Sequence, residues 1–189
     1  LLLTTIAALL VVGCENPEAD RALFDAACDG NIEDVRKYLD AGANINAKDY
    51  DGLTPLHLHL DSYYGNAPDK TTVEILIENG ANINAKSKNG FTPLDAAILV
   101  EQRKKLGTGI SDLLRSQGAR SGAETSLPVA ASLGDFQSIK KLLKAGSDIN
   151  KPTSSGSTLL HITASYGHKN ATELLLDSGA NINVIDDQG

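Results

Sequence analysis

The stretch 80–97 reads GANINAKSKNGFTPLDAA, and the stretch 42–59 reads GANINAKDYDGLTPLHLH, so the chain repeats nearly the same phrase at a spacing of 38 residues. A third version, AGSDINKPTSSGSTLLHITA, begins at Ala145, and a fourth, SGANINVIDDQG, begins at Ser178. A phrase that recurs with a period of about 20–50 residues is typical of repeat architectures. The sequence therefore predicts a stack of similar units.

Within one unit, the residue types predict two helices and a hairpin. Thr54-Pro55 is a helix start, because Thr caps first-turn amides and Pro at the first helical position sacrifices no needed N–H. A second helix is expected over TTVEILIEN at 71–79, and Gly80 ends it in a left-handed conformation. Asn89-Gly90 then turns the chain, since both residues tolerate positive φ.

These residues resemble the ankyrin repeat, which has a period of about 33 residues and the signature T-P-L-H-x-A. DGLTPLH at 51–57 and NGFTPLDAA at 89–97 match closely, and SGSTLLHITASYGH at 155–168 lacks the proline. The resemblance covers about residues 21–189 and implies an all-α ankyrin repeat solenoid of about five units with the start of a sixth, which leaves open a continuation beyond Gly189. The expected units are 21–50, 51–88, 89–122, 123–153 and 154–187.

Two departures from a regular period are visible. From Thr54 to Gly80 is 26 positions, against 21 from Thr158 to Gly179, so the second unit carries five extra residues near SYYGNAPDK. The third unit carries five more near VEQRKKLGTG. From Gly118 to Thr125 is only 7 positions, against 12 at the other junctions. The hairpin over 119–124 is therefore expected to be shortened or missing, and this junction is expected to be the weak point of the stack.

Composition limits the class of partner. The 189 residues carry a formal net charge of −7, so the chain lacks the basic stripe that binds nucleic acid. Aromatic residues make up 4% and Trp is absent, so Leu, Ile and Ala must fill the core, as in stacked helices. The basic cluster 103–105 is interpreted as a solvated helix face. We expect a monomer.

The N-terminus predicts a secretion signal. Residues 1–12 are apolar, too few to span a bilayer but right for the core of a signal peptide. The following VVGC, ending at Cys14, resembles the bacterial lipobox. That resemblance implies a truncated signal peptide over 1–13, cleavage before Cys14, palmitate on Cys14, a tether over 14–20, and a protein anchored in the bacterial cell envelope, facing the periplasm or the surface. An ordinary signal peptide with a chance Cys is the alternative.

The chemical motifs do not predict an enzyme. His57 and His59 are two residues apart on a helix, so their side chains point in different directions and cannot easily share a metal ion. The resemblance implies a structural role for His57, bonded near Thr54, and likewise for His161 and His168. GTGISD at 107–112 lacks the third Gly of a phosphate loop. Cys28 is interpreted as a small helix residue, and no cofactor or metal is expected.

What remains is a recognition surface. In ankyrin proteins, hairpin tips and first-helix positions form a concave face that binds other proteins. Mapped onto this chain, the expected partner-binding residues are Tyr50, Asp51, Leu53, Leu58, Asp61, Lys88, Asn89, Phe91, Ile162 and Tyr166, and Leu99 is a further first-helix position.

These features together predict a non-catalytic protein-binding module of a lipoprotein, for which a periplasmic inhibitor or immunity protein is one version. The alternative is a targeting or scaffold segment of a longer enzyme. A fold alone does not decide between them.

Overall fold

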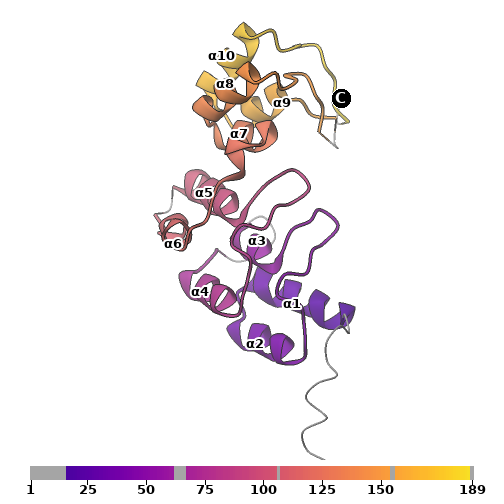
Figure 1. Cartoon of the computed structure of the whole chain (residues 1–189), viewed down its shortest axis with the longest axis vertical. Helices are drawn as coiled ribbons and strands as arrows, with labels where there is room; N and C mark the ends of the chain where they lie inside the picture. The colour runs from indigo at the N-terminus through magenta and orange to yellow at the C-terminus, as the bar shows by residue number, and fades with distance from the viewer. Residues whose placement is uncertain (1–15, 62–66, 106, 154–155, 188–189) are drawn as a thin grey trace, which may run out of the picture.

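The computed structural model describes residues 16–61, 67–105, 107–153 and 156–187. They form helices and no strand, which confirms the all-α prediction (Figure 1). The helices pair into five units stacked along the long axis, and first helices of successive units contact one another. The helices are α1 Pro17–Asp29, α2 Ile32–Asp40, α3 Pro55–Leu60, α4 Lys70–Glu78, α5 Pro93–Lys104, α6 Ile110–Ser116, the 3-10 turn η1 Gly122–Glu124, α7 Leu127–Leu133, α8 Phe136–Lys144, α9 Leu159–Ser165 and α10 Lys169–Asp177.

The N-terminal end differs from the expectation in one respect. Helix α1 begins at Pro17, with the Asn16 side chain accepting from the Ala19 N–H, so residues 17–20 of the expected tether are its first turn. The expected signal peptide and Cys14 lie outside the described residues. Among the helices that the structure describes, none is long and apolar enough to cross a bilayer.

Two connectors between units fold into short hairpins, which we call fingers: 49–53 and 87–91. Each is closed by a backbone bond between its first and last residue, as from Ser87 N–H to the Phe91 carbonyl, 2.9 Å. The two fingers are also bonded to each other, since the Lys88 N–H donates to the Asp51 carbonyl over 2.9 Å. The fingers therefore add a bonded layer to one side of the helix stack (Figure 1).

Asparagines below the fingers link successive units. The Asn46 side chain donates to the Gly80 carbonyl over 3.0 Å and accepts from the Asn82 N–H over 2.7 Å. Asn84 repeats this pattern one unit later, because it accepts from the Arg120 N–H over 2.8 Å. One further step of 38 residues leads from Asn84 to Gly122, which has no side-chain amide to form such a bond. The pattern is found again at Asn150, whose side chain accepts from the Asn181 N–H.

The junction between the third and fourth units is built differently from the others. The 3-10 turn 122–124 stands where a finger is expected, so the predicted shortening is found. Gly122 lies so close to the second finger that a Cβ atom on it would fall 2.0 Å from the Gly90 carbonyl oxygen. The Ser126 hydroxyl donates to the Asn89 carbonyl over 2.8 Å. Small residues of the turn and of the segment after it therefore pack directly against the second finger.

The buried core divides at this same junction. One apolar cluster is formed by units one to three and runs from Leu23 to Leu114. The other is formed by units four and five and runs from Ala123 to Leu175. Phe91, from the second finger, packs against the second cluster and is an apolar link between the blocks. We call 16–118 the first block and 119–187 the second block.

Candidate functional site

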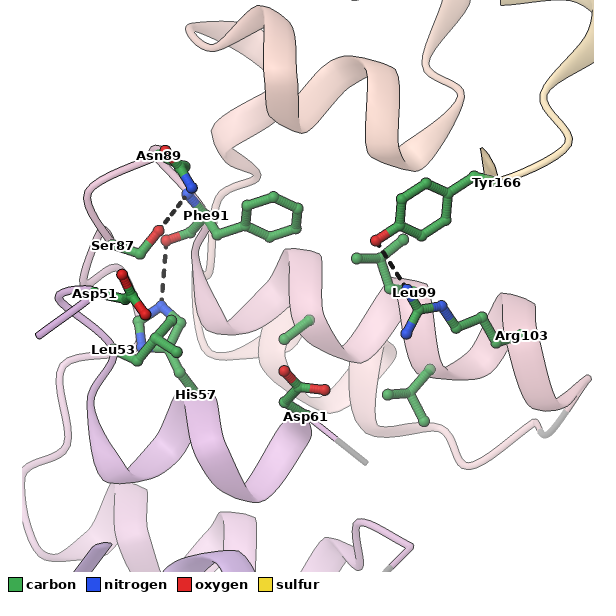
Figure 2. Close-up of a pocket in the computed structure, with 12 residues that line it drawn as sticks. Asp51, Leu53, His57, Asp61, Ser87, Asn89, Phe91, Leu99, Arg103 and Tyr166 are labelled. Carbon is green, nitrogen blue, oxygen red and sulfur yellow. Dashed lines mark hydrogen bonds between the residues drawn. The ribbon is translucent and has the colours of Figure 1, made fainter. Parts of the chain in front are cut away.

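A hollow of about 250 Å³ opens beside the two fingers, and we call it the groove (Figure 2). Its walls come from units two, three and five. Apolar side chains form much of the lining: Leu53, Phe91, Ala96, Leu99 and Val100. The remaining lining residues are Asp51, His57, Asp61, Ser87, Asn89, Arg103 and Tyr166.

Local hydrogen bonds fix the two apolar finger residues that line the groove. The Leu53 N–H donates to the Asp49 carboxylate over 2.8 Å, and the Phe91 N–H donates to the Ser87 hydroxyl over 3.1 Å. Both bonds join residues four apart at matching places in their fingers. Such side-chain bonds to nearby amides stabilise turns. They hold Leu53 and Phe91 at equivalent positions, one unit apart.

His57 lies beneath these fingers and joins two units. Its Nδ1 accepts from the Thr54 N–H over 3.1 Å, so its Nε2 carries the proton and donates to the Phe91 carbonyl over 3.2 Å. Burial lowers the pKa of this imidazole, despite the opposing effect of the Phe91 bond. His57 is therefore placed to act as a neutral structural donor.

His59 points toward unit one, on the other side of unit two from the contact that His57 makes. Its Nδ1 lies 2.8 Å from the Ala27 carbonyl oxygen in the first unit, and its Nε2 accepts from the Asp69 N–H over 3.2 Å. His57 and His59 thus contact different units, as the two-residue spacing predicted. Within the described residues, no group of three or more potential metal ligands is assembled.

The far wall of the groove depends on helix α5, which is longer than the first helices of units two, four and five. Helix α5 has 12 residues, whereas α3 has 6 and α7 and α9 have 7 each. The extra turns carry Arg103, which donates from Nη2 to the Tyr166 hydroxyl over 2.8 Å. The guanidinium carbon lies 4.8 Å from the Tyr166 ring centroid, within cation–π range. A side chain of unit three thereby closes onto unit five, as Figure 2 shows.

Two carboxylates lie on the wall that unit two provides. Asp51 and Asp61 line the groove itself (Figure 2). Burial raises the pKa of the neighbouring Cys28 thiol, and the charges of Asp29, Asp25 and Asp61 raise it further. A thiol with a raised pKa is a poor nucleophile, so Cys28 suits the packing role expected for it.

The structure brings together part of the expected surface. Six of the ten expected residues line the groove: Asp51, Leu53, Asp61, Asn89, Phe91 and Tyr166. Tyr50 does not, because it is 85% exposed at a finger tip, with the Lys88 Nζ 3.7 Å from its ring centroid. Lys88 instead lines a second hollow of about 540 Å³ beside the shortened junction. Leu58 and Ile162 are half-buried outside both hollows, and Ile162 packs against the second core cluster.

One expectation needs correction. The expected finger residues Tyr50, Leu53 and Phe91 do not share one binding surface, since Leu53 and Phe91 are half-buried in the groove and Tyr50 lies apart from it. Arg103, Lys104 and Lys105 are exposed, as expected for a solvated helix face, and Arg103 in addition lines the groove and donates to the Tyr166 hydroxyl. Tyr63 and Tyr64, in the extra residues of unit two, lie outside the described residues.

Comparisons with known proteins agree with this architecture. A family model for ankyrin repeats, described as three copies, matches residues 23–106 and 127–189. The unmatched stretch between them holds α6 and the shortened junction. The chain is similar to an L-asparaginase of Dirofilaria immitis, with 30% identity over 86% of the chain and 27% of that relative.

Two further relatives match a similar share of the chain. Rabankyrin-5 of Homo sapiens is 28% identical over 90% of the chain and 14% of its own length. Protein phosphatase 1 regulatory subunit 12A of Rattus norvegicus is 30% identical over 90% of the chain and 22% of its own length. The chain thus spans about a quarter or less of these three relatives. From the matched residues and the stacked helix pairs, the chain belongs to the ankyrin repeat family, a class of protein-binding modules.

Proposed function

We propose that this chain binds its protein partner at the groove and that none of its residues is catalytic. One observation carries the proposal: units two and three contribute apolar side chains to a single hollow beside the fingers, and Tyr166 of unit five completes its lining. Apolar hollows with a polar margin accept the anchor side chains that dominate protein interfaces. The exposed pair Tyr50 and Lys88 lies outside the groove, on the adjoining finger tips.

The test compares groove variants with a matched control. The immobilised chain is incubated with envelope extract of the native host, and captured proteins are identified. Leu53→Ser and Arg103→Ala should weaken capture of the same partner, by about thirtyfold if an anchor contact of about 2 kcal/mol is lost. Glu78→Gln, on α4 and outside the groove, should leave capture unchanged. Capture that depends on Glu78 but not on either groove residue would show that the binding face is elsewhere.

We further propose that the protein is a monomer anchored in the bacterial envelope by lipid on Cys14. The VVGC motif after an apolar run supports this. Metabolic labelling with a fatty-acid analogue should mark the native protein and not the Cys14→Ser variant. Equal labelling of both would contradict the anchor, and light scattering of the mature form would reveal any dimer.

For the biological role, we propose a periplasmic inhibitor or immunity protein that covers a toxin or cell-wall enzyme. A second role is supported by the relative named L-asparaginase, of which this chain matches 27%. In that alternative the repeats are a targeting or scaffold segment of a longer enzyme. The full-length gene decides between the two: an attached catalytic domain favours the second, and only further repeats favour the first.

A further inference from the structure

The first and second blocks have separate apolar cores, which bears on whether they can move relative to each other. Phe91 is an apolar link between the two cores. Two parts of a chain with separate cores are expected to move relative to each other unless a large apolar interface joins them. The polar contacts that cross from one block to the other therefore decide which motion is possible.

On the finger side, the blocks are joined by buried hydrogen bonds. The fully buried Asp95 carboxylate accepts from the Gly122 N–H over 2.8 Å and from the Ser121 hydroxyl over 2.5 Å. Phe91, four positions before Asp95, packs against the core of the second block on this same side. Water does not easily replace buried bonds, so this side is expected to stay together when other contacts break.

On the opposite side, the blocks are joined by exposed side chains at the end of helix α5. Arg103 donates to the Tyr166 hydroxyl over 2.8 Å, and the Gln102 side-chain amide donates to the Leu133 carbonyl over 3.5 Å. Arg103 and Gln102 are both exposed, so water competes for these bonds. Arg103 lies eight positions after Asp95 on α5, which is about 12 Å along the helix axis. A small rotation about the finger side is therefore enough to separate Arg103 from Tyr166.

The shape of the groove depends on this exposed contact. Among the lining residues that the structure describes, only Tyr166 comes from the second block. Figure 2 shows its hydroxyl directed at Arg103, on the side of the groove away from the fingers. Rotation of the second block away from α5 would carry Tyr166 with it and remove that part of the wall.

We propose that the two blocks rotate about the bonded contact at Asp95 and that Arg103 and Tyr166 form a latch that completes the groove. In closed molecules the latch is made, and Tyr166 is part of the wall. In open molecules the latch is broken, and the groove is wider. A ligand that contacts Tyr166 together with first-block residues binds the closed state more tightly and shifts the population toward it. The latch concerns the shape of the groove, so this inference stands apart from the proposed function.

The test measures distances between the two blocks by double electron–electron resonance, in a chain with Cys14 and Cys28 changed to Ser. Spin labels on Lys104→Cys and Asn170→Cys, both at exposed positions, report on the latch side. We expect Arg103→Ala to lengthen and broaden this distribution of distances. The ratio of closed to open molecules should fall about twofold to fivefold, as expected for an exposed hydrogen bond with a cation–π contact.

A second pair of labels reports on the finger side. Lys88 and Lys151 are exposed and line the same hollow beside the shortened junction, so Lys88→Cys and Lys151→Cys place labels near the axis of rotation. Their distribution should be the same in Arg103→Ala and in the wild type. Equal broadening of both label pairs would overturn the proposal, because the blocks would then come apart rather than rotate.

Two further variants keep the test specific. Tyr166→Phe removes the hydroxyl and keeps the ring under the guanidinium, so its effect on the latch-side distances should be intermediate. Arg36→Ala removes another exposed guanidinium, on α2, and should change neither distribution. A latch-side distribution that is identical in the wild type, Arg103→Ala and Tyr166→Phe would refute the latch. Far-UV circular dichroism of each variant checks that the helices are retained.

Discussion

At the junction after unit two and at the junction after unit three, one buried side chain bonds the connector that follows. The side chain is a hydrogen-bond donor at the first junction and an acceptor at the second. In unit two, the Thr54 cap is paired with His57, which donates to the carbonyl of Phe91 in the following finger. In unit three, the Thr92 cap is paired with Asp95, which can only accept.

The connectors explain the difference. The finger after unit two presents a carbonyl oxygen, whereas the turn after unit three presents the Gly122 N–H and the Ser121 hydroxyl, 2.8 Å and 2.5 Å from the Asp95 carboxylate. The side chain at this place is therefore matched to whichever backbone group the next connector turns inward. A departure from the repeat signature marks a change in the neighbouring connector, 27 residues away in the chain.

The largest expected effect comes from removing Asp95, which is fully buried. Asp95→Ala leaves the Thr92 N–H, the Gly122 N–H and the Ser121 hydroxyl without their acceptor. Buried unpaired groups cost about 1–3 kcal/mol each, so the free energy of unfolding should fall by about 3 kcal/mol or more in urea titrations. Asp95→His should not restore stability, because the turn offers donors. Rescue by histidine would refute the matching of side chain and connector.

A smaller loss is expected when the close approach at Gly122 is disturbed. A Cβ on Gly122 meets the Gly90 carbonyl oxygen at 2.0 Å, so Gly122→Ala must push the turn away from the second finger. Overpacking of this kind costs about 1–3 kcal/mol. Gly107→Ala is the matched control, since nothing lies within 4 Å of its added Cβ. Equal melting temperatures for the two variants would show that the shortened junction is not tightly packed.

The bridge between Arg103 and Tyr166 should contribute less again. It joins the first block to the second beyond the short helix α7, and both partners reach the surface. A double-mutant cycle of Arg103→Ala and Tyr166→Ala should give a coupling energy of about 1 kcal/mol. Urea unfolding of the four proteins measures it. Strictly additive losses would mean that the bridge does not hold the two blocks together.

The smallest effect is the pH dependence that distinguishes the two junctions. Burial lowers the pKa of His57 in the folded state below its unfolded value of about 6.5. The unfolded chain then binds more protons as the pH falls through that value, so stability is full above it and declines below it, until the folded pKa is reached. His57→Gln should flatten the decline between pH 7 and pH 5. The same slope in both proteins would assign the pH dependence to other groups.

Much of the fold could be predicted because the repeat gives several signals in phase. Thr-Pro starts, terminal glycines and Asn-Gly turns are local, and each fixes its own element. The pairing of Thr54 with His57 is local too, at three residues apart. The shortened junction could be counted directly, because five missing positions change the spacing of the glycines.

The groove could be predicted only in part, because its far wall depends on distant contacts. Counting showed five extra residues in unit three, but the count does not say whether they lengthen a helix or a loop. Their helical course carries Arg103 to Tyr166, 63 residues later. The stretch 89–97 was interpreted as a close match to the signature, so the role of Asp95 in place of His was not predicted, and its partner Gly122 carries no recognisable motif.

The fit between Asp95 and the shortened junction also constrains the mutational history of this chain. Restoring five residues at 119–124 would return a finger carbonyl to the place of the Gly122 N–H and set it against a buried carboxylate. Changing Asp95 to histidine first would set a donor against the donors of the present turn. A protein with only one of the two changes is thus expected to be less stable than the present chain or a chain with both changes. We therefore expect the short connector and Asp95 to be inherited, and to be lost, together.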